Sequence, residues 1–138
     1  MTAAAESGSL NGRPPAVRNG IRLLWVAVVV QGFLTIGMLP TGIAPLFVTI
    51  FVVWALIAWA VSKGWRLGRV AHLIFSAYLV VTYIWSLSLV HWNLSGYQAV
   101  DLALDSIRYG CNTLAAVLLW TPQASRWFNA HRANVAAL

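Results

Sequence analysis

The stretch Val100–Pro122, VDLALDSIRYGCNTLAAVLLWTP, determines how the rest of this chain must be arranged. It is long enough to cross a bilayer, whose hydrocarbon core of about 30 Å needs about 20 residues of helix. Charged side chains are costly in hydrocarbon unless another group pairs with them. The stretch nevertheless carries four strongly polar residues: Asp101, Asp105, Arg108 and Asn112. It therefore predicts a membrane span that other spans must shelter.

These four residues form one narrow strip, called the polar stripe below. At about 100° per residue, all of them lie within about 40° of Asp101 on a helical wheel. Asp105 and Arg108 are three residues apart and can pair directly. Below Asn112 the strip continues with Ala115 and Ala116, which allow close helix approach. The opposite side suits lipid. The partners that we expect on the first and third spans are Gln31, Thr35, Tyr83 and Ser86.

The composition places the whole chain in the membrane class. Of 138 residues, 60% are hydrophobic and only 9% are charged, whereas soluble domains carry roughly 25% charged residues. The predicted fold is all-α: a polytopic bundle of four transmembrane helices followed by a short interfacial amphipathic helix. The expected spans are residues 21–39, 46–62, 70–90 and 100–120.

The remaining segments complete the predicted organisation. Residues 1–20 are expected to form a flexible cytoplasmic tail, residues 21–121 the bundle, and residues 122–138 an amphipathic cytoplasmic tail. The first apolar run is longer than a signal-peptide core and lacks an A-x-A-like cleavage site, so we expect it to remain as an uncleaved anchor. In the third span, His72 lies near the basic end, which predicts an interfacial residue rather than a proton relay.

The positions of the basic residues predict topology. Of nine Lys and Arg residues, eight fall in the N-terminal flank, the 63–69 loop or the C-terminal tail; Arg108 is the ninth. By the positive-inside rule these segments should be cytoplasmic, in the cell inner membrane, with both termini inside. The net charge of +6 thus indicates anionic lipid headgroups as partners, not nucleic acid. The expected headgroup contacts are Lys63, Trp65, Arg66, Arg69, Arg126 and Trp127.

No enzyme chemistry is predicted. Cys111 is the single cysteine, and the sequence contains no metal-ligand cluster, no phosphate-binding loop and no nucleophile beside a base. We therefore expect no catalytic residue, metal or cofactor. The favoured interpretation of the polar stripe is a buried Asp–Arg pair that fixes helix packing in a structural or interaction subunit, whose partner is another membrane protein or a second copy.

Two alternatives remain open for the stripe. One is a small proton- or cation-coupled transporter, with Asp105 as the carrier and Asp101 at the mouth of the path. The other is a small-molecule pocket lined by Tyr83, Trp85 and Tyr109.

Two interfacial motifs carry a resemblance. The loop Gly64-Trp65-Arg66-Leu67-Gly68-Arg69 and the closing Thr121-Pro122 with Arg126-Trp127-Phe128 resemble segments of small uncharacterised bacterial inner-membrane proteins. The resemblance extends over most of the chain and implies neither an activity nor site residues. Four-helix multidrug exporters place an essential Glu in the first span, and residues 21–39 contain no carboxylate, so that class is excluded.

Overall fold

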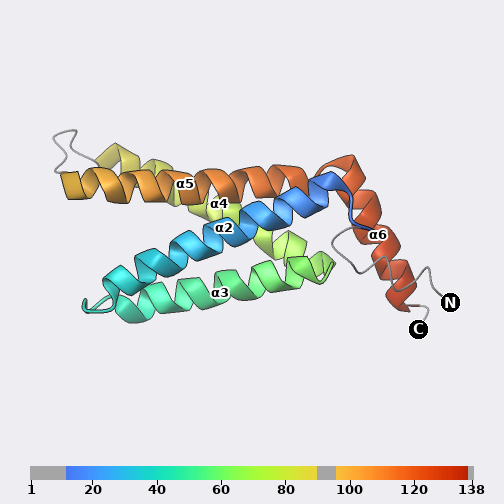
Figure 1. The fold of residues 1–138 in the computed structure, drawn as a ribbon, viewed down its shortest axis with the longest axis horizontal. Helices are drawn as coiled ribbons and strands as arrows, with labels where there is room; N and C mark the ends of the chain where they lie inside the picture. The colour runs from blue at the N-terminus through green and yellow to red at the C-terminus, as the bar shows by residue number, and fades with distance from the viewer. Residues whose placement is uncertain (1–11, 90–95, 137–138) are drawn as a thin grey trace.

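The computed structural model describes residues 12–89 and 96–136, and this part of the chain contains helices and no strand (Figure 1). The helices are α2 (Pro15–Met38), α3 (Ala44–Ser62), α4 (Arg66–Leu89), α5 (Gly96–Leu119) and α6 (Pro122–Ala136). Within the described residues, α2, α3 and α4 are long and apolar enough to cross a membrane. The fourth predicted span, α5, is 24 residues long, as are α2 and α4. It is not among these three helices because its polar stripe lowers its mean hydropathy.

Local sequence signals explain where the helices begin and end. Pro15 stands in the first turn of α2, where its missing N–H costs nothing. Gly64 ends α3 with φ at 79°, a left-handed conformation that favours glycine. Thr121 caps α6 by accepting a hydrogen bond from the backbone N–H of Ala124 at 3.4 Å.

The helices start earlier than the predicted spans. Residues 15–20, which the sequence assigns to a flexible tail, form the first turns of α2, and Val17 is fully buried there. Pro15 favours helix initiation and Val17 anchors the turn in the core, so the tail prediction is wrong for these six residues. The rest of the predicted tail, apart from residues 12–14, lies outside the described residues, as do residues 90–95 between α4 and α5.

Each of the four long helices packs against two of the other long helices, and α2 and α5 also contact α6. α2 contacts α5 and α3, α3 contacts α4, and α4 contacts α5. In Figure 1, α2 runs diagonally, beside α5 near α6 and beside α3 at the opposite end. Gly20 permits the first approach, since a Cβ there would lie 3.0 Å from Leu119 Cγ. Gly68 permits the contact of α4 with α3, since a Cβ there would lie 2.7 Å from Ala60 Cβ and 2.9 Å from the backbone nitrogen of Val61.

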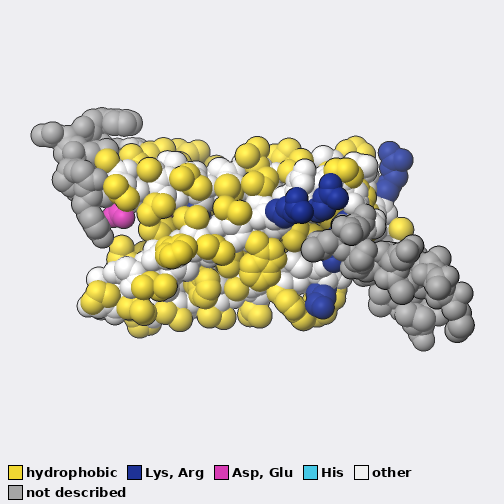
Figure 2. Space-filling model, in the orientation of Figure 1, with side chains coloured by type: hydrophobic (Ala, Val, Ile, Leu, Met, Phe, Trp, Pro, Cys, Tyr) yellow, Lys and Arg dark blue, Asp and Glu magenta, His cyan; other side chains and the backbone are white. Residues whose placement is uncertain are grey.

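The core lies along these contacts, and the outer surface is apolar. Buried residues include Leu24 and Ala27 of α2, Trp54 of α3 and Ala115 of α5. Figure 2 shows hydrophobic side chains over the long sides of the molecule, with the Lys and Arg side chains of this face toward the end where α6 lies in Figure 1. Soluble monomers rarely expose such continuous apolar surface. The fold therefore has the surface of a membrane protein.

Candidate functional site

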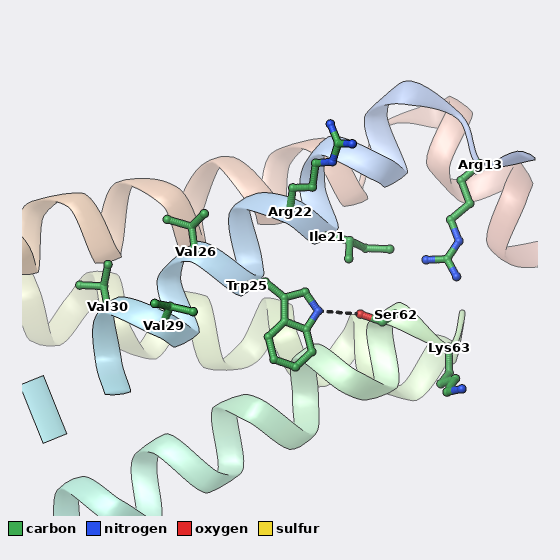
Figure 3. Close-up of a pocket in the computed structure, with 9 residues that line it drawn as sticks. All are labelled: Arg13, Ile21, Arg22, Trp25, Val26, Val29, Val30, Ser62 and Lys63. Atoms are coloured by element: carbon green, nitrogen blue, oxygen red, sulfur yellow. Dashed lines mark hydrogen bonds between the residues drawn. The ribbon is translucent and has the colours of Figure 1, made fainter. Parts of the chain in front are cut away.

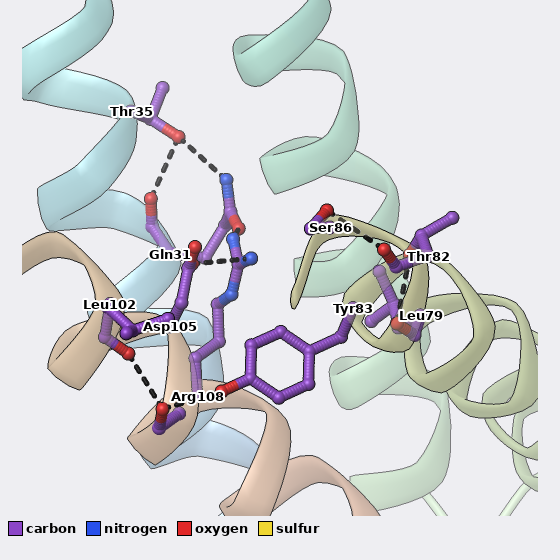
Figure 4. Close-up of polar contacts among 10 residues, drawn as sticks. Gln31, Thr35, Leu79, Thr82, Tyr83, Ser86, Leu102, Asp105 and Arg108 are labelled. Atoms are coloured by element: carbon purple, nitrogen blue, oxygen red, sulfur yellow. Dashed lines mark hydrogen bonds and ion pairs between the residues drawn. The ribbon is translucent and has the colours of Figure 1, made fainter. Parts of the chain in front are cut away.

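Arg108 is the centre of a buried polar core. Its side chain extends from α5, and the residue is only 7% exposed. Nη2 lies 2.7 Å from Asp105 Oδ1 on the same helix, and Nη1 donates to Gln31 Oε1 on α2 (Figure 4). The guanidinium carbon is also 4.4 Å from the centroid of the Tyr109 ring. Both terminal nitrogens of the guanidinium are thus engaged, one within α5 and one across to α2.

Thr35 holds the amide of Gln31 in the orientation that Arg108 requires. Gln31 Nε2 donates to Thr35 Oγ1 at 3.2 Å, and Thr35 Oγ1 donates to the backbone carbonyl of Gln31 at 2.8 Å. Both residues are buried. With its nitrogen committed to Thr35, the Gln31 amide presents its oxygen to the guanidinium (Figure 4). Gln31 and Thr35 therefore act as one acceptor unit on α2.

A second buried polar group joins α5 to α4. Asn112 Oδ1 lies 3.0 Å from His72 Nε2, and Asn112 Nδ2 donates to Ser76 Oγ at 2.8 Å. All three side chains are buried. Because Asn112 Oδ1 can only accept, Nε2 carries the hydrogen in this pairing. His72 Nδ1 has no hydrogen-bond partner among the described residues.

Sequence reasoning did not assign His72 and Ser76 to this site. The sequence predicts an interfacial His72 near the basic end of the third span; in the structure its side chain is fully buried between α4 and α5 and faces the protein. α4 begins at Arg66, so His72 already lies in the second turn of the helix when it meets Asn112. The spacing of His72 and Ser76, four residues apart on one helix face, was the available signal.

The two predicted partners on α4 behave differently from the partners on α2. The hydroxyl of Tyr83 lies 2.6 Å from Ser106 Oγ of α5, and its ring is 4.4 Å from that of Tyr109. Tyr83 thus reaches the stripe helix beside Arg108 and contacts the ring under the guanidinium. Ser86 instead donates to the carbonyl of Thr82 on its own helix at 2.9 Å (Figure 4). Asp101 is half-buried in α5.

The three aromatic residues proposed to line a small-molecule pocket do not converge. Tyr83 and Tyr109 stack together, but Trp85 is 69% exposed on α4. No group of three or more His, Cys, Asp or Glu side chains within the described residues could hold a metal ion.

One of the expected headgroup contacts faces the protein instead. Arg69 is 6% exposed, and its Nη2 donates to Ser125 Oγ of α6 at 2.7 Å. Its guanidinium carbon lies 4.1 Å from the Trp120 ring centroid and 5.2 Å from that of Phe128. Arg69 therefore ties α4 to α6, because stacking on two rings and a hydroxyl acceptor are available inside.

The other expected headgroup contacts are accessible to different degrees. Lys63, Trp65, Arg66 and Arg126 are at least partly exposed. Trp127 is half-buried, and the guanidinium carbon of Arg13 lies 5.5 Å from its ring centroid.

Comparisons of this chain with protein-family models, with curated proteins and with solved structures found no match. Function must therefore be inferred from the polar core and from the surface of the molecule.

Proposed function

We propose that this chain is a four-span inner-membrane protein, with α5 as the fourth span, and that it serves as a structural or interaction subunit. The observation that carries this proposal is the state of Arg108. Its Nη2 is paired with Asp105 and its Nη1 donates to Gln31, so the guanidinium joins α5 to α2. A charge held in this way fixes the packing of two helices.

The faces of α5 support its role as a span. Its polar side is covered by the protein: Arg108 and Asn112 are buried, as are Ala115 and Ala116 below them. Its outer side is apolar, with Ile107, Leu114 and Val117 all more than half exposed. A helix that buries its charges and exposes its aliphatic side chains has the polarity required in lipid.

The charge distribution supports a single orientation. In Figure 2 the Lys and Arg side chains lie toward one end of the molecule and the visible Asp or Glu side chain lies toward the other. By the positive-inside rule the basic end, where α6 lies (Figure 1), is cytoplasmic.

An exposed stripe on α4 supports an interaction role. Ile74, Tyr78, Val81 and Trp85 are each more than 60% exposed, and their spacing of four, three and four residues places them within an arc of about 60°. Such spacing matches the seam by which one helix packs along another. A partner helix in the membrane can therefore pack along this stripe.

Neutralising variants test the structural role against the transport alternative. Asp105→Asn and Arg108→Gln are each expected to weaken assembly in mild detergent, and the double variant is expected to recover part of that loss. A reconstituted Asp105→Asn protein that stays folded but loses a proton-linked flux would replace the structural role with transport.

Co-purification of a partner in mild detergent tests the exposed stripe on α4. Trp85→Ala is the test variant and Trp65→Ala is the matched control, and loss of the partner in the first alone identifies the surface that binds it.

A further inference from the structure

A groove at the basic end of the molecule lies apart from the polar core. It has a volume of about 710 Å³ and runs along α2 beside the C-terminal end of α3 (Figure 3). Its lining combines an apolar wall with several cations and one hydroxyl. The lining residues are Arg13, Ile21, Arg22, Trp25, Val26, Val29, Val30, Ser62 and Lys63.

The charge of this lining is of one sign. Arg13, Arg22 and Lys63 contribute cations, and no acidic side chain lines the groove. The acidic residues of the described chain, Asp101 and Asp105, both belong to α5, in the half of that helix farther from the basic end. The groove is therefore complementary to an anion.

The polar and apolar parts of the groove are arranged in sequence along α2. Trp25 Nε1 donates to Ser62 Oγ at 3.1 Å, which fixes the indole between the two helices (Figure 3). Arg13 and Lys63 lie past this indole toward the basic end, while Val29 and Val30 follow on the other side and the Arg22 side chain points away from Lys63 (Figure 3). Tryptophan is enriched where headgroups meet acyl chains.

The apolar wall extends from the headgroup level into one leaflet. Trp25 and Val30 are five residues apart, which corresponds to about 7.5 Å along a helix. Half of a hydrocarbon core of about 30 Å is about 15 Å, so this wall covers about half the depth of one leaflet. A molecule that carries an anionic head and an apolar chain therefore fits both parts of the groove.

We propose that this groove binds one anionic phospholipid of the cytoplasmic leaflet, with its phosphate beside Arg13 and Lys63 and an acyl chain along Val29 and Val30. The proposal rests on the membrane placement proposed above. The phospholipid is preferred to a peptide because the phosphate satisfies the cations while the acyl chain continues the apolar wall into the bilayer.

Lipid binding by the full-length protein in delipidated micelles tests this site. Native mass spectrometry should detect one tightly held phosphatidylglycerol in preference to phosphatidylcholine of the same chain length. Each surface cation contributes about fivefold to anionic-lipid affinity, so the Arg13→Gln, Lys63→Gln double variant should bind phosphatidylglycerol about 25-fold more weakly. The Arg66→Gln, Arg126→Gln double variant removes the same charge from positions outside the groove and should retain binding. Equal losses in the two double variants would overturn the site.

A second variant separates the acyl chain from the headgroup. Val29→Trp keeps every cation and fills part of the apolar wall, so it should weaken phosphatidylglycerol binding. Inorganic phosphate alone should not compete with the lipid, and full competition would indicate a free-anion site instead. If the wild-type protein fails to incorporate into vesicles, the membrane placement itself fails. If it incorporates but shows no preference for phosphatidylglycerol, only the lipid site fails.

Discussion

Replacing Gln31 by Leu removes the acceptor that joins α2 to the guanidinium of α5. Leucine has a similar size and keeps the helix apolar, so the main change is the loss of one buried acceptor. Arg108 then keeps its 2.7 Å contact with Asp105 on its own helix, but its Nη1 no longer donates to α2. Thr35 loses its amide donor and retains the carbonyl of residue 31 as its acceptor.

The magnitude follows from the burial of Arg108, which is 7% exposed. A hydrogen bond to a charged group contributes about 1.5–3 kcal/mol in folded proteins. Interhelical hydrogen bonds measured in membranes average only about 0.6 kcal/mol and reach about 1.7 kcal/mol. Because the donor is charged and buried, the upper part of the membrane range applies. We expect Gln31→Leu to cost about 1.5 kcal/mol of unfolding free energy.

A double-mutant cycle with Arg108→Met isolates the pair. The side chain of Asp105 is 38% exposed, so it can be solvated when the arginine is removed. The sum of the two single costs should therefore exceed the cost of the double variant by about 1 kcal/mol. The assay is reversible unfolding in mixed micelles as the fraction of denaturing detergent rises. Thr49→Val serves as the control, because its hydroxyl bonds only the carbonyl of Pro45 on its own helix at 2.8 Å. A coupling energy below about 0.3 kcal/mol would refute a stabilising hydrogen bond between Gln31 and Arg108.

Three further outcomes follow from the packing. Gly68→Ala should cost about 1–3 kcal/mol of unfolding free energy in the same assay, because its Cβ would clash with Ala60 and with the backbone of Val61. The control variant Gly37→Ala has open space around it and should be neutral or stabilising. Equal effects of the two variants would contradict the close approach of α4 to α3. Arg69→Lys keeps the charge but loses stacking on Trp120, so hydrogen exchange should quicken in α6 and not in α3; unchanged exchange would show that Arg69 does not hold α6. Reporters fused after Leu138 and inserted at Thr41 should lie on the cytoplasmic and periplasmic sides, respectively, and a periplasmic signal from the first would reverse the proposed orientation.

The helical periodicity of the sequence predicts which residues form the polar stripe, but it does not predict all the residues that contact them. Asp105, Arg108 and Asn112 follow from the 3.6-residue turn, and Gln31 and Thr35 share a face because they are four residues apart. The predicted third span starts at residue 70, whereas α4 begins at Arg66. Counting residues along a helix predicts the position of a side chain along the helix axis, but not how the helix is rotated relative to its neighbours. Tyr83 thus meets Ser106 and Tyr109 rather than the guanidinium itself, and Ser86 bonds its own backbone.

The burial of the Arg69 side chain against α6 could not be predicted from the sequence of the basic loop. Lys63, Arg66 and Arg69 look equivalent as topology signals in the sequence. Only tertiary packing separates them: Arg69 meets Ser125, Trp120 and Phe128 because α6 folds back against the ends of α2 and α5. Cations followed at a distance by aromatic residues are too common in membrane proteins to specify such a contact in advance.

The bond between Gln31 and Arg108 joins residues that are 77 positions apart in the chain. At about 5–20 residues per second, a ribosome completes the first span about 4–15 s before it supplies the arginine. During that interval the amide of Gln31 has only Thr35 on its own helix as a partner in the native arrangement. A chain that lacks α5 therefore leaves this amide without the guanidinium that covers it in the complete fold.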